Sequence, residues 1–377
     1  MHPDVGAHPA APGRTLSDIA ALRQRLRERG ARAGHEQRIL RLWTQARPLD
    51  EGRRRAESFL PKPLLQALPA VQADLAALAQ LASEHPGADG SSRLLVRLAD
   101  GMTCESVLLA PGRIPGLCVS TQIGCAVGCR FCMTGRDGLI RQLGSAEIVA
   151  QVALARRLRP VRKVVFMGMG EPAHNLDNVM EAIELLGTVG DIGHKNLVFS
   201  TVGDARAFER LPQGPVKPAL ALSLHTTRAD LRAELLPHAP RIAPGDLVEA
   251  ADAYARATGY PVQVQWTLLE GINDAPDEVQ ALAALLRGRH AVLNLIPYNT
   301  VPDLPYRRPA WERAAAMARE LHGLGVLTKL RRSAGQDVDA GCGQLRAREA
   351  RRAGDAGDTP ALQPVKLRRT ISVALAG

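Results

Sequence analysis

The chain has 377 residues, of which 46% are hydrophobic and 23% charged, as in an ordinary soluble globular protein. It lacks a run of about eighteen apolar residues, which excludes a membrane-spanning helix. Its formal net charge of +10 favours a polyanionic partner, although an arginine-rich composition alone explains the charge equally well. The first residues, MHPDVGAHPAAPGR, lack the basic start and apolar core of a secretory signal, so we expect a cytoplasmic protein.

The N-terminal part of the chain predicts a small helical domain. Residues 1–14 are rich in Pro, Ala and Gly, and we expect them to be disordered. Residues 15–90 favour a helical accessory domain, because TLSDIAALRQRLRERG and HEQRILRLWTQ place apolar residues at helical spacing. The segment SEHPGADGSS, residues 83–92, is rich in turn formers and predicts a linker at the end of this domain.

Residues 91–348 alternate between short apolar runs and amphipathic stretches. The expected strands are 93–99, 105–110, 117–122, 163–168, 196–201, 219–225, 262–269, 292–298 and 326–331. The expected helices are 145–158, 176–189, 228–236, 246–258, 276–287 and 310–323. This alternation predicts an α/β fold, a partial (β/α)6 barrel with its active site at the C-terminal strand ends. We expect residues 349–377 to form a basic tail.

Three of the six cysteines, Cys125, Cys129 and Cys132, form a C-x3-C-x2-C cluster within GCAVGCRFCMTG. A loop of this length can direct all three sulfurs to one metal centre. Structural zinc uses four protein ligands, usually as two pairs, and the sequence offers no second pair. Three thiolates on a four-iron cluster leave one iron free for a small molecule. The spacing therefore favours an iron–sulfur cluster, with zinc as the alternative.

The cysteine cluster, with Phe131 before its last cysteine, resembles the motif of the radical S-adenosylmethionine (SAM) superfamily. Further motifs follow in order: VVFMGMGEPAHNLDNV, FSTVGD, ALSLHTTRADLRAELLP, GINDAPDEV, NLIPYNT and DVDAGCGQL. Together they resemble the RlmN/Cfr family of RNA adenine-carbon methyltransferases over residues 95–348. The resemblance implies a radical SAM barrel with one [4Fe–4S] cluster on the three cysteines and two SAM molecules per turnover.

The resemblance also assigns SAM-binding residues at successive strand ends. Gly170 and Glu171 would hold the methionyl ammonium of SAM. The rest of the molecule would contact Ser200, Ser223, Leu224, His225 and Asn299. Taken one at a time, these residue types are also common in turns and caps. Their shared position at strand ends favours a common site.

Three further residues would carry the chemistry in a member of this family. Cys342, a lone thiol between two glycines, would accept a methyl group from SAM as the S-methylcysteine intermediate. Cys118 would resolve the RNA-linked intermediate through a transient disulfide with Cys342. Glu105 would be the proton acceptor. Without the resemblance, Glu105 would be an exposed strand residue and Cys342 a buried apolar one. We expect Cys104 to be structural.

The implied function is methylation of C2 of an adenosine in large-subunit ribosomal RNA, and also in transfer RNA. Methylation at C8 or another RNA target is the alternative, because Leu139, Thr300, Gln336 and Gly341 depart from the common family pattern. A non-catalytic metal-containing RNA-binding protein is the alternative from a different class. The expected partners are RNA, whose phosphates arginines of the N-terminal domain and of the C-terminal tail would contact, and a reducing electron donor such as flavodoxin. We expect a monomer with no membrane partner.

Overall fold

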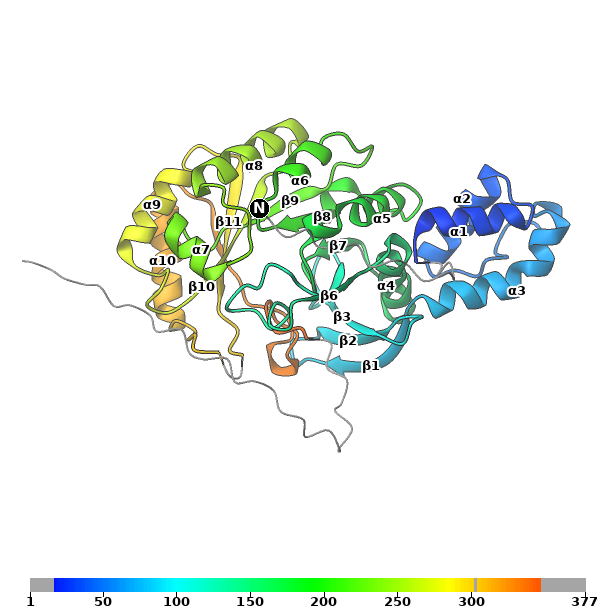
Figure 1. Ribbon diagram of the computed structural model, residues 1–377, viewed down its shortest axis with the longest axis horizontal. Coiled ribbons are helices and arrows are strands. Elements are labelled where there is room, and N and C mark those ends of the chain that lie inside the picture. The colour runs from blue at the N-terminus through cyan, green and yellow to red at the C-terminus, as the bar shows by residue number, and fades with distance from the viewer. Residues whose placement is uncertain (1–16, 302–303, 347–377) are drawn as a thin grey trace, which may run out of the picture. The chain divides into compact units, whose positions relative to one another are not determined.

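The computed structural model describes residues 17–301 and 304–346. Its centre is a ten-stranded sheet in the order β1-β2-β3-β4-β7-β8-β9-β10-β11-β12 (Figure 1). These strands are β1 (Gln80–Pro86), β2 (Ser92–Arg97), β3 (Thr103–Leu108), β4 (Gly116–Cys118), β7 (Lys163–Phe166), β8 (Leu197–Thr201), β9 (Ala219–Ser223), β10 (Val262–Leu268), β11 (Ala291–Pro297) and β12 (Thr328–Leu330). Strands β5 (Gln122–Gly124) and β6 (Leu139–Gln142) form a separate antiparallel hairpin. The predicted disordered N-terminus and basic tail lie outside the described residues.

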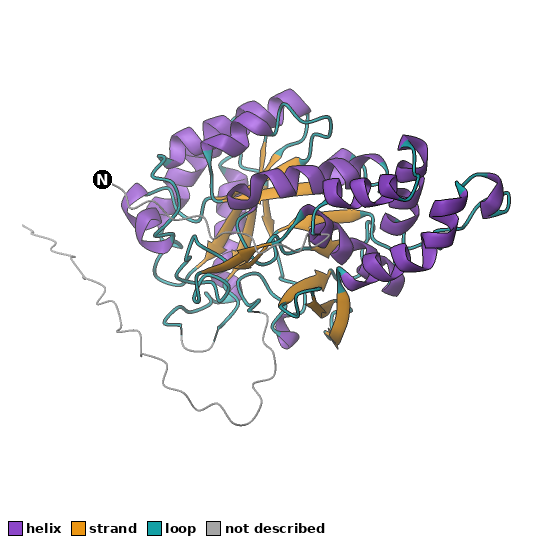
Figure 2. Cartoon of the chain, turned by 45° about the vertical axis from the view of Figure 1, so that its right-hand side comes forward, coloured by secondary structure: helices purple, strands orange, loops and turns teal. Residues whose placement is uncertain are grey.

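The seven strands from β4 to β12 in the sheet are parallel, and each consecutive pair is joined through a helix. These helices are α4 (Ser145–Leu158), α5 (Leu176–Thr188), α6 (Ala205–Arg210), α7 (Ala229–Leu235), α8 (Pro244–Thr258), α9 (Pro276–Leu286) and α10 (Trp311–Gly323). Right-handed crossovers that all advance in one direction place their helices on one face of the sheet, as Figure 2 shows. Six βαβ units result, and the predicted partial (β/α)6 barrel is confirmed.

Strands β1, β2 and β3 extend the sheet beyond β4 through antiparallel pairs of β4 with β3, β3 with β2 and β2 with β1. The prediction of a linker at residues 83–92 is wrong, because this segment contains the end of β1, a tight turn and the start of β2. The turn closes where the Gly87 N–H donates to the Ser91 carbonyl at 2.8 Å. The side chains of β1 are mostly exposed and polar, so this edge strand has no apolar signal in the sequence.

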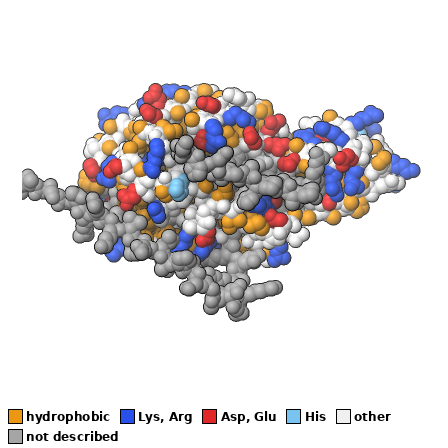
Figure 3. All heavy atoms as spheres, in the orientation of Figure 1, with side chains coloured by type: hydrophobic (Ala, Val, Ile, Leu, Met, Phe, Trp, Pro, Cys, Tyr) orange, Lys and Arg blue, Asp and Glu red, His pale blue; other side chains and the backbone are white. Residues whose placement is uncertain are grey.

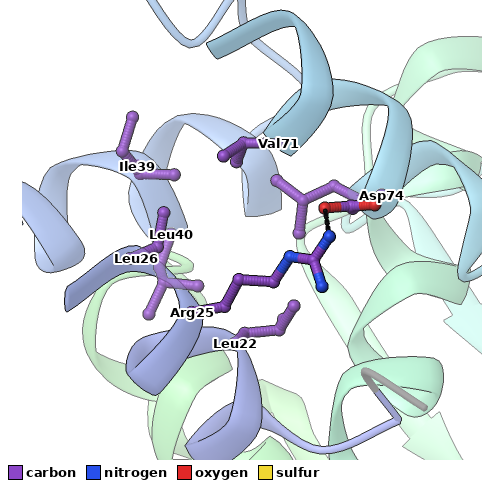
Figure 4. A pocket seen from close by; sticks show the side chains of 8 residues that line it. Leu22, Arg25, Leu26, Ile39, Leu40, Val71 and Asp74 are labelled. Atoms are coloured by element: carbon purple, nitrogen blue, oxygen red, sulfur yellow. Dashed lines mark ion pairs between the residues drawn. The ribbon is translucent and has the colours of Figure 1, made fainter. Parts of the chain in front are cut away.

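The N-terminal helices are α1 (Ile19–Glu28), α2 (Ala33–Thr44) and α3 (Lys62–Ala77). They pack through apolar side chains around a gap of about 10 Å³, shown in Figure 4. Arg25 on α1 reaches across this gap to Asp74 on α3, with 2.8 Å between nitrogen and oxygen. The gap holds one water molecule at most, so it is a packing defect and not a ligand site.

These helices are attached directly to the barrel through α4. The Ile19 N–H donates to Ser145 Oγ at 2.9 Å, and Arg156 donates to the Thr44 carbonyl at 2.7 Å. The buried side chains of helices and sheet belong to one continuous hydrophobic core. Within the described ranges, every helix is too short or too polar to cross a membrane.

Candidate active site

The three clustered cysteines lie in the long loop of the β5–β6 hairpin, residues 125–138. The loop closes where the Cys125 N–H donates to the Gly138 carbonyl at 2.9 Å. Gly124 has a φ of +74°, and a Cβ at this position would lie 2.0 Å from the same carbonyl oxygen. Only glycine fits there, which gives a steric reason for the Gly-Cys sequence at the start of the loop.

The cysteine sulfurs are poorly solvated. Burial raises the pKa of Cys125 to about 12, and burial followed by repulsion from Cys132 and Cys125 raises the pKa of Cys129 well above its ordinary value. A positively charged metal centre would offset the free-energy cost of holding three thiolates close together in a buried site. Among the described residues, no three His, Cys, Asp or Glu side chains converge as a single metal ion requires. An iron–sulfur cluster does not need that arrangement, because each thiolate binds a different iron.

The cysteine loop forms one wall of a cavity of about 150 Å³ at the C-terminal ends of the parallel strands. This is the end at which barrels of this class place their active sites. Nine of the predicted site residues line the cavity: Cys125, Cys129, Cys132, Gly170, Glu171, Ser200, Ser223, His225 and Cys342. The sequence motifs therefore converge in space.

Glu171 presents a buried carboxylate to this cavity from the segment after β7. One oxygen accepts a hydrogen bond from the Ala173 N–H at 3.1 Å, and the other accepts from the Val202 N–H at 3.0 Å. Burial raises the pKa of Glu171 to about 7, against the opposite effect of hydrogen bonds from Thr201 and Val202. A ligand ammonium group would stabilise the charged form of this carboxylate.

His225 is buried just after β9, with a left-handed φ of +66°. Its Nδ1 accepts a hydrogen bond from the Thr267 N–H at 3.0 Å, so the neutral ring carries its proton on Nε2. Burial, with a smaller effect of Arg232, lowers the pKa of His225 to about 3, and the ring stays neutral. The ring meets Phe131 edge-on with 5.0 Å between centroids, which links this strand end to the cysteine loop.

Cys342 lies in a turn next to the cysteine loop. The Met133 N–H donates to the Gly343 carbonyl at 2.8 Å, and a Cβ on Gly343 would lie 3.3 Å from the Phe131 carbonyl oxygen. Cys118 is buried at the end of β4, and its pKa is raised by burial and then by the charge of Cys342. Both cysteines are free thiols in this structure.

Glu105 is buried on β3 and does not line the cavity. One carboxylate oxygen pairs with the Arg93 side chain, and the other accepts a hydrogen bond from the Arg346 N–H at 2.8 Å. Glu105 therefore contacts the C-terminal segment that carries Cys342, and the reading of Glu105 as an exposed residue is wrong. Cys104, beside it, is fully buried in the hydrophobic core.

Sequence similarity to known proteins identifies the family of this chain. The sequence model of the Radical SAM superfamily matches residues 119–286. A protein of Leptothrix cholodnii named "Probable RNA methyltransferase" is 73% identical over 88% of this chain and 94% of its own length. A relative from Pseudomonas aeruginosa with the same description is 65% identical over 87% of this chain and 94% of its own. The chain belongs to the RlmN/Cfr family of radical SAM methyltransferases.

The solved structures agree with this membership. The crystal structure of a radical SAM methyltransferase from Sphaerobacter thermophilus matches this radical SAM methyltransferase with a TM-score of 0.75. The two sequences are 34% identical over 88% of this chain and 98% of the other. The shared fold extends beyond the residues that match the superfamily model, into the helical N-terminal part and the C-terminal segment.

Enzymes of the radical SAM superfamily use a [4Fe–4S] cluster and SAM, and the residues of this methyltransferase fit both groups. Cys125, Cys129 and Cys132 would hold the cluster and leave one iron for the amino and carboxylate groups of SAM. The buried Glu171 carboxylate suits the amino group by charge, and the neutral His225 ring suits an uncharged part of SAM.

Two predicted SAM-binding residues of the methyltransferase lie away from the cavity lining. Leu224 is fully buried, and its N–H donates to the Gln265 carbonyl at 3.1 Å. The Asn299 amide donates to the Cys342 carbonyl at 3.0 Å and to Ser333 Oγ at 2.8 Å. In this conformation Asn299 holds the Cys342 turn. Contact of either residue with SAM stays a prediction.

Three polar residues of the site were missed in the sequence. Gln122 accepts a hydrogen bond from the Glu171 N–H at 2.7 Å. A Cβ on Gly170, whose φ is +103°, would lie 2.6 Å from the Gln122 Cβ, so this close approach requires glycine. Gln265 and Thr267 line the cavity from β10. Gln265 and Thr267 are two positions apart in VQVQWTLL. Side chains at this spacing lie on the same face of a strand, and this pattern was the signal in the sequence for both residues.

Proposed function

We propose that this enzyme methylates C2 of an adenosine in structured RNA, with large-subunit ribosomal RNA as its main substrate and transfer RNA as a second. The relatives named as RNA methyltransferases support RNA as the substrate. The placement of Cys342 carries the proposal, because its thiol lines the same cavity as the three cluster cysteines. A thiol in this place can carry one carbon from SAM to RNA.

The chemistry of adenine explains why a carrier is required. C2 lies between two ring nitrogens and is electron-poor, so it does not attack the SAM methyl group as a nucleophile. The Cys342 thiolate can attack it. A carbon–sulfur bond forms to Cys342, the sulfonium carbon–sulfur bond breaks, and S-adenosylhomocysteine leaves. Cys342 is exposed in the cavity, which gives the methyl donor access to its sulfur.

When bound, the cluster and a second SAM supply a 5′-deoxyadenosyl radical through one-electron cleavage of the sulfonium. Loss of a hydrogen atom then turns the S-methyl group of Cys342 into a carbon radical, which adds to C2 and links the RNA to the protein. Glu105 would accept the C2 proton, and the cluster would supply the acceptor for the one electron that the ring must lose to become aromatic again. The Cys118 thiolate attacks the Cys342 sulfur, and the released carbon takes the bonding pair and a solvent proton. Cellular thiols reduce the resulting disulfide.

The N-terminal helices are suited to contact the RNA backbone. Residues 17–79 contain twelve basic and seven acidic residues, and Lys and Arg side chains gather over this end of the molecule in Figure 3. Five arginines line a groove of about 710 Å³: Arg38, Arg41, Arg47, Arg53 and Arg54. Glu51, which also lines the groove, is paired with Arg47. The arginines of this groove that are not paired with Glu51 are suited to bind successive phosphates of an RNA backbone.

The alternatives differ from this proposal in target or in chemistry. Methylation of C8, or of another RNA, uses the same residues and is distinguished by the product. A non-catalytic RNA-binding protein has no use for Cys342, Cys118 and Glu105 together, and membership of the methyltransferase family counts against it. A reducing electron donor such as flavodoxin, and action in the cytoplasm as a monomer, belong to the same proposal.

Mass spectrometry of RNA nucleosides from cells with and without the gene tests the proposal. We expect deletion of the gene to remove 2-methyladenosine from ribosomal RNA and from transfer RNA. Loss of 8-methyladenosine instead would favour the alternative target atom. An unchanged set of methylated adenosines would contradict the proposed activity.

A further inference from the structure

The segment that carries Cys342 is anchored at both ends by side chains of two antiparallel strands. Arg93 on β2 donates from Nε to the Val338 carbonyl at 2.7 Å. Glu105 on β3 accepts from the Arg346 N–H at 2.8 Å. Cys342 lies midway along the segment, four residues from each anchored position.

The two anchoring side chains also bind each other. Arg93 donates to the Glu105 carboxylate, and the two side chains are only 15% and 2% exposed. In the sheet register Arg93 lies opposite Val107, so Arg93 and Glu105 project from the same face of neighbouring strands. One guanidinium group therefore fixes the proposed proton acceptor and the thiol segment together.

We propose that Arg93 is a positioning residue for the transfer of the methyl group to Cys342. The inference rests on the proposed function and deepens it. Arg93 does not line the cavity, so it acts through the segment and not on SAM. A segment held at both ends confines the Cys342 thiol to few positions and raises its effective concentration beside the methyl donor. Loss of Arg93 removes one of the bonds that hold the Val338 end and the cation that orients Glu105.

Other contacts keep the segment attached when Arg93 is absent. Asp89 in the β1–β2 turn accepts from the Gly335 N–H at 3.1 Å, and Asp337 accepts from the Ala88 N–H at 2.8 Å. Beyond Cys342, Thr134 donates to a segment carbonyl at 2.6 Å. An Arg93 variant should therefore fold and retain slow methylation of Cys342.

The experiment measures the rate of Cys342 methylation without RNA. The cluster-reconstituted enzyme is incubated with SAM that carries a trideuteromethyl group, and the labelled Cys342 peptide is quantified by mass spectrometry. Arg93→Met removes both donors but keeps an apolar stem. Arg93→Lys keeps the positive charge but lacks the planar guanidinium group, which donates to the Val338 carbonyl and the Glu105 carboxylate at the same time. Arg97→Met is the matched control, because Arg97 is exposed on the same strand.

We expect the rate constant for this single methylation of Cys342, at saturating SAM, to fall about 10- to 100-fold in Arg93→Met, with less loss in Arg93→Lys and none in Arg97→Met. The apparent KM for SAM, the concentration that gives half the maximal rate in this single-turnover reaction, should not change, because Arg93 lies outside the cavity lining. Iron content and melting temperature are measured on the same samples. We expect the iron content to match that of the control and the melting temperature to fall, because Arg93→Met leaves the Glu105 carboxylate buried without its cation.

The outcomes separate this inference from the proposed function. Equal rates in Arg93→Met and the control would overturn the role of Arg93. A lower rate accompanied by lost iron or a raised KM would also overturn it, since Arg93 would then act through general folding. If Arg93→Met does not fold, a wild-type rate in Arg93→Lys would overturn the inference. A wild-type enzyme that acquires no label on Cys342 would instead overturn the proposed function itself.

Discussion

Glu105 accepts a hydrogen bond from the backbone N–H of Arg346 at 2.8 Å, although 241 residues separate the two in the sequence. The bond joins β3 to the C-terminal segment that carries Cys342. Glu105 therefore has two tasks in the proposed reaction. It holds the segment before RNA is attached and takes a proton afterwards. A carboxylate can perform these tasks in turn, because the oxygen that Arg346 engages would be free for a proton once that hydrogen bond is broken.

Two substitutions of Glu105 should separate these tasks. Glu105→Gln keeps an oxygen that can accept from the Arg346 N–H, but it loses the affinity for a proton. We expect Cys342 methylation near the wild-type rate and accumulation of a covalent protein–RNA adduct. Glu105→Ala should slow both stages. Peptide mass spectrometry and denaturing gels with labelled RNA measure the two stages, and free methylated RNA formed by Glu105→Gln at the wild-type rate would refute the second task.

The two reactive thiols should give opposite phenotypes. Cys342→Ala should abolish turnover, because the carbon has no carrier. Cys118→Ala should trap RNA on Cys342, because no thiolate can attack the linked sulfur. Denaturing gel electrophoresis detects the trapped species, and Cys104→Ala, which alters a buried core residue, is the control with retained turnover. Normal release of product by Cys118→Ala would rule out its role as the resolving thiol.

Glu171→Gln should weaken SAM binding without removing the cluster. The amide oxygen can accept from only one of the two backbone donors, the N–H of Ala173 or of Val202, and the neutral amide cannot form an ion pair with the SAM ammonium. Loss of a charge-assisted hydrogen bond should raise the KM for SAM about 10- to 100-fold. Kinetics at varied SAM concentration measure this change, with Glu184→Gln on the exposed side of α5 as the control. An unaltered KM would show that Glu171 does not bind the amino group.

Charge reversal in the arginine groove should weaken RNA binding. Both Arg53 and Arg54 line the groove and are exposed, and their replacement by Glu puts negative charge next to the phosphates. We expect weaker binding, with the largest loss at low salt, and a slope of log K against log salt concentration reduced by the equivalent of about two phosphate contacts. Fluorescence anisotropy measures the binding, with exposed Arg287→Glu as the control. Equal affinities for the two variants would place the RNA elsewhere.

Much of the fold could be predicted from local periodicity. All nine expected strands and all six expected helices are present, because buried strands and amphipathic helices leave strong patterns. Strand β1, helix α6 and the β5–β6 hairpin were missed. Strand β1 is a polar edge strand, and α6 has only six residues, too few to show a helical period.

The site could be predicted only where its signals are local. The spacing of Cys125, Cys129 and Cys132 is such a signal, and the structure brings these residues to one cavity. The bond of Arg93 to Val338 joins residues 245 positions apart, and no local pattern encodes it. For the same reason the contact of Asn299 with the Cys342 turn was not predicted.

One measurement tests most directly whether Cys342 carries the carbon. The wild-type enzyme is supplied with SAM that bears a trideuteromethyl group, and the methylated adenosine from the RNA product is analysed by mass spectrometry. Radical formation removes one deuterium from the carried methyl group, and release adds one solvent proton. The account predicts a product methyl group with two deuterium atoms and one hydrogen. A product with all three deuterium atoms would mean direct transfer of the intact methyl group and would contradict the account.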